Sequence, residues 1–170
     1  MKRVFAGGIL FVTLSMCPSI LAHANSLSYI PTEEQTGVPV DIYQNAEIIG
    51  HTFNICPELL MALAERESRF TADAENGSCK GLMQVSTNFH KQRFIDAGWS
   101  TNDWDNSYKN MYVAGSYLSD LFRDYEDVGI VLGLYHGESD AVSRGKKGQL
   151  SSYVNQILER SEQLERLHGK

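Results

Sequence analysis

The chain has 170 residues, of which 42% are hydrophobic and 21% charged, so it can bury the core of one domain. Its formal net charge is −6 and it carries no basic stripe, which argues against a nucleic-acid ligand because nucleic acids bind clustered Lys and Arg. The sequence also lacks the basic amphipathic helix that is typical of proteins bound to a membrane surface.

The N-terminus has the features of a secretory signal peptide. Two of the first three residues are positively charged, residues 5–21 are mostly apolar, and Ala22-His23-Ala24 is a small-x-small cleavage site. The apolar stretch is short and contains Pro18, which argues against a stable membrane span. We therefore expect residues 1–24 to be removed near Ala24 and the protein to be exported to the periplasm, cell wall or extracellular space.

The three cysteines raise two questions. Leu14-Ser15-Met16-Cys17 resembles a lipoprotein signal, although Met16 stands where a small residue is expected, so a lipid anchor is an alternative to cleavage. Cys56 and Cys79 form an even pair, which in an exported protein predicts a disulfide. Such a bridge would stabilise the fold by roughly 3 kcal/mol in the chain-entropy model. Two buried free thiols are the alternative.

After the signal peptide, residues 25–40 are predicted to be a disordered or extended spacer, because proline and glycine are frequent and apolar residues are few. A domain is predicted over residues 41–170. It begins with a helix from Asp41, which can cap it, to about Phe53. Pro57 suits the first position of the next helix, where its missing N–H leaves no hydrogen bond unmade.

The helix that starts at Pro57 places one glutamate on its apolar face. Leu60, Leu63, Ala64 and Glu67 recur at helical spacing, so Glu67 continues the apolar stripe. Burial disfavours the charged form of a carboxyl group and raises its pKa, which lets it hold a proton at neutral pH as a general acid must. The alternative is a boundary carboxylate paired with an arginine. A solvated face is predicted for Glu58, Glu65, Arg66 and Arg69.

The rest of the chain also predicts helices, because its apolar residues recur at helical spacing. Their approximate ranges, after a polar loop over 71–80, are 87–97, 107–125, 128–135 and 150–164. No segment shows the alternation that is typical of a strand. The predicted fold class is therefore mainly α, a single domain with little or no sheet.

Four short segments carry residues that fit a known family. Glu67-Ser68-Arg69-Phe70 has the form E-S-x-F, and Gly81-Leu82-Met83-Gln84 is a complete G-L-M-Q. Leu134-Tyr135-His136-Gly137 is an imperfect A-Y-N-x-G, with histidine in place of asparagine and the glycine one place early, and Ser152-Tyr153-Val154 follows. Together they resemble the soluble lytic transglycosylase (SLT) family, lysozyme-like enzymes that cut the glycan strands of bacterial peptidoglycan. The resemblance covers about residues 52–160.

The resemblance implies a lysozyme-like fold, a site and a reaction. Glu67 would be the single general acid and base that cleaves the β-1,4 bond between N-acetylmuramic acid and N-acetylglucosamine, with formation of a 1,6-anhydro end. The implied substrate-binding residues are Ser68, Met83, Gln84, Tyr135 and Tyr153. The stretch between Glu67 and Gly81 is shorter than the family commonly shows, which implies a trimmed loop.

Two other functions stay open at this point. A hydrolase of the same fold would use Glu67 with water and a second acid from a polar loop. The candidates for that acid, each predicted to be solvated, are Asp73, Glu75, Asp103 and Asp105. A non-catalytic wall-binding or scaffold protein would keep the fold without the reaction.

The predicted partner is the peptidoglycan glycan strand, and the chain is predicted to be a monomer. No cofactor or metal is expected, because the histidines show no ligand spacing such as H-E-x-x-H and two cysteines without a histidine pair do not make a zinc site. A small single-domain enzyme suits general wall turnover. It also suits local opening of the wall for a secretion or conjugation apparatus.

Overall fold

Eight α-helices, one 3-10 helix and three two-residue strands make up residues 31–170, the part of the chain that this computed structural model describes. The fold is mainly α with very little sheet, as predicted. The predicted signal peptide and Cys17 lie outside the described residues. The helices are α2 (Glu33–Thr36), α3 (Val40–Phe53), α4 (Pro57–Ser68), α5 (Lys91–Asp96), η1 (3-10, Thr101–Asp105), α6 (Ser107–Asp124), α7 (Val128–Tyr135), α8 (Ala141–Gly145) and α9 (Ser152–Leu167).

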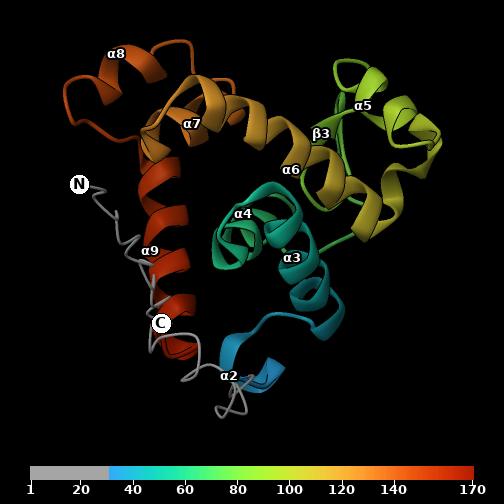
Figure 1. Cartoon of the computed structure of the whole chain (residues 1–170), viewed down its shortest axis with the longest axis horizontal. Coiled ribbons are helices and arrows are strands. Elements are labelled where there is room, and N and C mark those ends of the chain that lie inside the picture. The colour runs from blue at the N-terminus through green and yellow to red at the C-terminus, as the bar shows by residue number, and fades with distance from the viewer. Residues whose placement is uncertain (1–30) are drawn as a thin grey trace, which may run out of the picture. The chain divides into compact units, whose positions relative to one another are not determined.

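Helix α4 lies at the centre of these elements, with α9 on one side and α3 on the other (Figure 1). Every residue from Leu59 to Ala64 is buried, because a helix that packs against neighbours on several sides has no solvated face in its middle. Pro57 occupies the first turn, as predicted. The helix leaves the core only at its last turn, which is where Glu67 lies.

Helix α6 packs against α3, which also contacts α4. Gly115 allows this close approach, since a Cβ there would come within 2.8 Å of Ile49 and 2.9 Å of Phe53. Within residues 31–170, no helix is both long and apolar enough to cross a bilayer.

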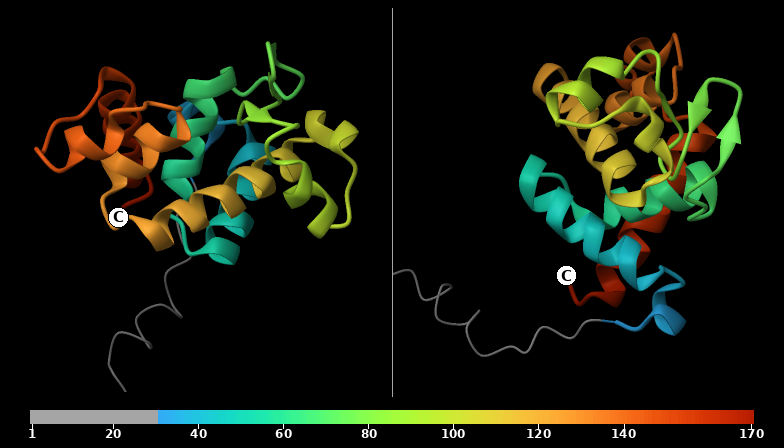
Figure 2. Two further views of the ribbon diagram at one scale, coloured as in Figure 1. Left: turned by 90° about the horizontal axis from the view of Figure 1, so that it is seen from above. Right: turned by 90° about the vertical axis from the view of Figure 1, so that its right-hand side faces the viewer.

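The strands β1 (Glu75–Asn76), β2 (Cys79–Lys80) and β3 (Val85–Ser86) form an antiparallel sheet in that order. The β1–β2 hairpin projects from the helices (Figure 2). It turns at Gly77, whose φ of +60° is a conformation that glycine adopts without strain. Strands of two residues are too short to show alternation, so the sequence pattern did not predict them.

One buried side chain holds the turn between β2 and β3. Asn110 of α6 is fully buried and accepts a hydrogen bond from the backbone N–H of Met83 at 2.8 Å. Its amide nitrogen donates to the carbonyl oxygens of Lys80 at 3.0 Å and Trp104 at 2.9 Å. Gly81 passes so close that a Cβ would lie 2.3 Å from the Asn110 amide nitrogen. Asn110 therefore joins the sheet, η1 and α6.

The predicted Cys56–Cys79 disulfide is wrong for this structure, in which both thiols are free. Cys56 precedes the first turn of α4, whereas Cys79 lies in β2, beside a hollow that Tyr135 also lines. The neighbours of the two thiols differ, since Cys56 lies against Glu58 and Glu165 whereas Cys79 lines the hollow with Gln84 and Tyr135. The thiol of Cys56 donates instead to the Glu58 carboxylate at 3.0 Å.

Glu58 was predicted on a solvated face, and this too is corrected, because its side chain is fully buried. His168 Nδ1 and Lys170 Nζ each lie 2.6 Å from one of its oxygens. Burial raises the pKa of Glu58, but hydrogen bonds from Cys56, Lys170 and His168 lower it to about 2. His168 and Lys170 come from the far end of the sequence, so helical spacing within α4 could not reveal them.

The predicted spacer is also partly structured. The described residues 31–40 contain α2, whose first turn is closed by a capping box between Thr32 and Gln35. Val38 is buried, and Arg160 of α9 donates a hydrogen bond to the Thr36 carbonyl at 2.5 Å. Contacts with α9 therefore order a segment whose composition alone predicts no structure.

We expect Asn110→Ala to lower the free energy of unfolding by about 2–4 kcal/mol, because a buried N–H and two partly buried carbonyls lose their partner. Urea denaturation followed by circular dichroism measures this. The control is Asn155→Ala on the exposed face of α9, which should change the free energy by less than about 0.5 kcal/mol. Equal, small effects of both variants would show that the turn does not depend on Asn110.

Candidate active site

Glu67 lies in the last turn of α4 and is partly buried. Leu60, Leu63 and Ala64, which share its face, are fully buried, so the predicted apolar face is confirmed. The hydroxyl of Tyr153, in the first turn of α9, donates a hydrogen bond to Glu67 Oε1. The packing of α4 against α9 therefore brings together two of the predicted site residues.

The surroundings of Glu67 favour its protonated form. Burial raises its pKa, whereas the hydrogen bond from Tyr153 and the charges of His136 and Arg66 lower it, and the net shift is upward. An acid whose pKa is raised keeps its proton closer to neutral pH, which suits proton donation to a leaving group. Within residues 31–170, no neighbouring carboxylate contributes to this shift.

Two neighbouring side chains contact the ring of Tyr153. The His136 ring stacks on it, with centroids 3.8 Å apart and planes 8° from parallel, and Arg66 Cζ lies 5.5 Å from the ring centroid. Burial and the nearby Glu67 charge raise the pKa of Tyr153, so its hydroxyl stays protonated and able to donate. From the sequence, His136 was noted only because it replaces the asparagine that is usual in this motif. Its contact with Tyr153 is new.

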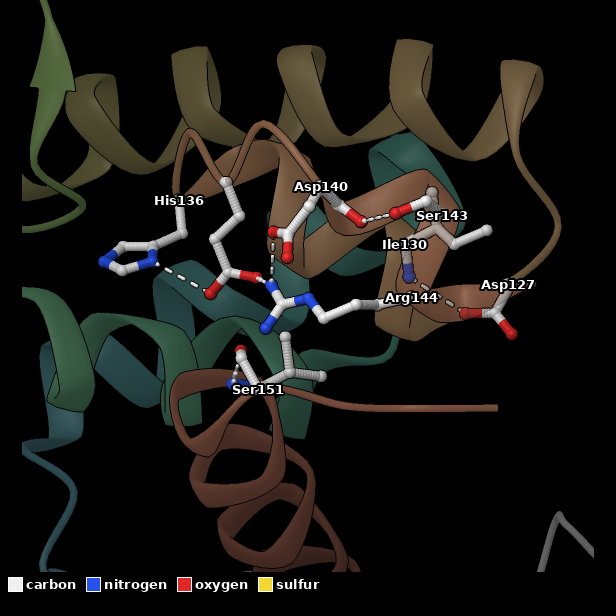
Figure 3. Close-up of polar contacts among 9 residues, drawn as sticks. Asp127, Ile130, His136, Asp140, Ser143, Arg144 and Ser151 are labelled. Atoms are coloured by element: carbon white, nitrogen blue, oxygen red, sulfur yellow. Dashed lines mark hydrogen bonds and ion pairs between the residues drawn. The ribbon is translucent and has the colours of Figure 1, made fainter. Parts of the chain in front are cut away.

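A polar network fixes His136 in turn (Figure 3). His136 Nδ1 lies 3.3 Å from one carboxylate oxygen of Glu138, while Arg144 binds the other oxygen and also lies 3.1 Å from Asp140. Burial raises the pKa of Glu138, but hydrogen bonds from Ser151 and His136 and the Arg144 charge outweigh it and lower the pKa. Glu138 therefore stays ionised and connects the end of α7 to α8 and to the residue that caps α9.

Two predicted substrate-binding residues interact mainly within the protein. The Met83 side chain is fully buried, so the predicted contact with a sugar face is corrected and Met83 is a core residue. Its carbonyl oxygen accepts a hydrogen bond from the Tyr135 hydroxyl at 2.7 Å. The Ser68 hydroxyl donates to the Ala64 carbonyl at 3.2 Å, which leaves only its oxygen lone pairs for a ligand.

Gln84 has a side-chain oxygen free for a ligand. Its amide nitrogen donates to the carbonyls of Ala74 at 3.1 Å and Gly81 at 2.9 Å, and its backbone adopts a left-handed φ of +48°. Within residues 31–170 its carbonyl oxygen forms no hydrogen bond. The loop therefore fixes the orientation of the amide while one acceptor stays available.

Gln84, Tyr135 and His136 line a hollow of about 270 Å³. The other lining residues are Cys79, Val85, Ser86, Phe89, His90, Tyr117, Leu134 and Gly137, and none of the set is Asp, Glu, Lys or Arg. Burial and the Arg93 charge lower the pKa of His90 to about 4, so this ring is neutral at pH 7. Phe89 is 75% exposed at this hollow. Its lining is therefore aromatic and uncharged, which suits a neutral sugar.

The loop acids considered for a hydrolase are engaged elsewhere or exposed. Glu75 pairs with Lys80 at 2.8 Å, and Asp103 pairs with Lys109 at 3.0 Å and takes part in the capping box of η1. Asp73 and Asp105 are exposed. In the part of the chain that the structure describes, no three His, Cys, Asp or Glu residues are grouped so as to hold a metal ion.

Comparisons with known proteins agree with this geometry. The family model of the transglycosylase SLT domain matches residues 44–154. No curated protein matches the sequence significantly. Among solved structures, the chain is similar to an inactive mutant of the lytic transglycosylase Slt from Pseudomonas aeruginosa, with a TM-score of 0.55 and 15% identity.

That match covers 85% of this chain and 25% of the Pseudomonas chain, so this chain spans about a quarter of the length of the larger protein. At this identity the likeness shows a common fold, the predicted lysozyme-like one. The family model is the stronger finding because it covers more than half of the sequence, including all four motif segments. The chain belongs to the transglycosylase SLT domain family, as those segments predicted.

Proposed function

We propose that this chain is a peptidoglycan lytic transglycosylase in which Glu67 is the single general acid and base. One observation carries the proposal: a partly buried carboxyl group with a raised pKa is held by the Tyr153 hydroxyl, and the Arg66 charge acts on it. Such a group donates a proton near neutral pH and is stabilised as a carboxylate once the proton has gone.

Glu67 transfers a proton twice in the proposed reaction, first as an acid and then as a base. Protonated Glu67 gives its proton to the oxygen that joins N-acetylmuramic acid to N-acetylglucosamine, while the N-acetyl group of the muramic acid stabilises the cation that forms at C1. The Glu67 carboxylate then removes the proton of the 6-hydroxyl of the same sugar as that oxygen bonds to C1. Glu67 ends protonated, no water is consumed, and the product carries a 1,6-anhydro end.

The neighbouring side chains would support these steps. Tyr153 would stabilise the carboxylate between the two proton transfers, and the stacked His136 would keep the tyrosine ring in place. The free oxygen of Gln84 would accept a hydrogen bond from a sugar hydroxyl or an N-acetyl N–H. Phe89 and Tyr135 line the uncharged hollow, where aromatic rings can pack against sugar faces.

The single acid supports a transglycosylase over a hydrolase. Glycosidases that use water ordinarily carry two carboxyl groups about 5–9.5 Å apart, one on each side of the scissile bond. Here the loop acids pair with lysines or lie exposed, and Glu138 is bound by Arg144. An internal nucleophile, the 6-hydroxyl of the sugar, removes the need for the second carboxylate.

Peptidoglycan lies outside the cytoplasmic membrane, so we propose that the protein is exported. The predicted signal peptide at residues 1–24 is consistent with export. Monomeric state and association with a secretion or conjugation apparatus stay predictions from the size of the chain.

We expect Glu67→Gln to lower the rate of muropeptide release from purified sacculi by about 10²–10⁴-fold, because the general acid is lost. Mass spectrometry of the products made by residues 25–170 should find 1,6-anhydro ends from the unsubstituted protein. Glu162→Gln on the exposed face of α9 is the matched control and should keep full activity. Reducing ends would instead indicate a hydrolase, and no release by the folded, unsubstituted protein would favour a wall-binding or scaffold role.

We expect Tyr153→Phe to move the alkaline limb of the pH–rate profile to higher pH. The acid form of Glu67 is the active one, so activity falls as pH rises through its pKa. The hydrogen bond from Tyr153 lowers that pKa and burial raises it, so removal of the hydroxyl leaves the pKa higher. The rate at the optimum should fall as well, since the carboxylate loses its donor.

The matched control for this profile is Tyr125→Phe, at the end of α6, which should leave the limb where it is. A limb that moves to lower pH in Tyr153→Phe, or that moves equally in both variants, would contradict the role given to Tyr153.

A further inference from the structure

A second and larger hollow, of about 510 Å³, lies between α4 and α9. We call it the arginine groove. Its charged, polar and aromatic lining residues are Glu65, Arg66, Arg69, Phe70, Gln156 and Arg160.

The arginine groove lies beside the site, because Arg66 and Arg69 are close to Glu67 in the sequence, although neither Glu67 nor Tyr153 lines the groove. On α9, Tyr153, Gln156 and Arg160 follow one another at spacings of three and four residues, so they share one face of the helix. Arg66 lines the groove and also lies 5.5 Å from the Tyr153 ring centroid. Arg66 therefore links the groove to the tyrosine that is hydrogen-bonded to Glu67.

In the described part of the chain, two of the arginines in the groove have no carboxylate partner. Arg160 is engaged, with Nε 2.6 Å from Glu65 and a guanidinium nitrogen 2.5 Å from the Thr36 carbonyl. Arg66 and Arg69 are exposed, and within residues 31–170 neither side chain forms an ion pair or a hydrogen bond. Three arginines thus face one glutamate in a chain whose net charge is −6. Such a local reversal of charge attracts an anion.

The backbone beside the groove is in an unusual conformation. Arg69 has a φ of +53° at the C-cap of α4, and Phe70 follows with a φ of +63°. Glycine is the common residue at such a left-handed cap, because a Cβ is unfavourable there. This chain instead places an arginine and a phenylalanine at two consecutive left-handed positions, and both side chains line the groove. Strain of this kind persists mainly at functional sites.

We propose that the arginine groove binds a carboxylate of the peptide stem of peptidoglycan, so that the enzyme selects glycan strands that carry stems. The inference rests on the proposed function. The stem is attached to N-acetylmuramic acid, the sugar whose bond is cut, so it enters the site together with that sugar. Guanidinium groups bind carboxylates through two parallel hydrogen bonds. The sugar backbone is neutral and gives unpaired arginines no partner.

The test compares three substrates of the same strand length. They are glycan strands with intact stems, the same strands with stem carboxylates converted to amides, and bare strands from which an amidase has removed the stems and whose newly exposed lactyl carboxylates have then been converted to amides. We expect the unsubstituted protein to cleave stem-bearing strands about tenfold faster than bare strands at low concentration, the gain of one charge-assisted hydrogen-bonded contact. Amidated strands should behave like bare ones.

The variant that tests the groove is Arg69→Gln, since Arg69 has no contact with Glu67 or Tyr153. We expect it to lower the ratio of the two rates, stem-bearing over bare, by about tenfold, mainly through KM. Arg69→Lys should restore part of the ratio because it keeps the charge. Arg123→Gln is the matched control, because this exposed arginine lies on α6 and pairs with Asp120, and it should leave both rates unchanged.

Several outcomes would overturn the inference. Equal cleavage of stem-bearing and bare strands, a preference that survives amidation, or a ratio that Arg69→Gln leaves unchanged would each remove the carboxylate from the groove while the proposed function stands. Failure of the folded, unsubstituted protein to cleave any strand would overturn the proposed function itself. Binding of a muramyl tetrapeptide to Glu67→Gln, measured by calorimetry with and without Arg69→Gln, gives a readout that needs no catalysis.

Discussion

The packing of α4 against α9 is the constraint on which the site depends. It brings the Tyr153 hydroxyl to the Glu67 carboxyl across 86 positions of sequence, and it buries that carboxyl enough to raise its pKa. The same two helices are tied at their other ends, where buried Glu58 in the first turn of α4 binds His168 beyond the end of α9. The alignment of the two helices is therefore fixed by polar contacts at both ends and by apolar side chains between them.

The two hollows near Glu67 and Tyr153 differ in charge. The hollow beside Gln84 and Tyr135 is aromatic and uncharged, which suits a neutral sugar strand. The arginine groove is positively charged, which suits the acidic substituents of such a strand. Asn110 positions the first environment by holding the turn before Gln84, and α9 shapes the second. A substrate with a neutral backbone and charged side branches would match both environments at once.

Local features of the sequence predicted much of this arrangement. Helix α7 spans the predicted Val128–Tyr135, and α4 begins at Pro57, because apolar periodicity and first-turn preferences act over a few residues. The same periodicity predicted the face on which Glu67 lies. The stack of His136 on Tyr153 and the burial of Glu58 depend on partners far along the chain, so no spacing revealed them. The disulfide was predicted from the number of cysteines, which does not indicate how far apart Cys56 and Cys79 lie in the fold.

The positions of Arg66 and Glu67 link recognition to catalysis. Arg66 lines the groove and its charge lowers the pKa of Glu67, against the larger effect of burial. A carboxylate bound in the groove would neutralise part of that charge, so the pKa of Glu67 would rise in the complex and the acid would hold its proton more firmly. A bare strand would leave the Arg66 charge unopposed. Binding of the stem would thus both place the muramic acid and favour the protonation state that the first step needs, which makes selection of stem-bearing strands a property of the catalytic rate as well as of affinity.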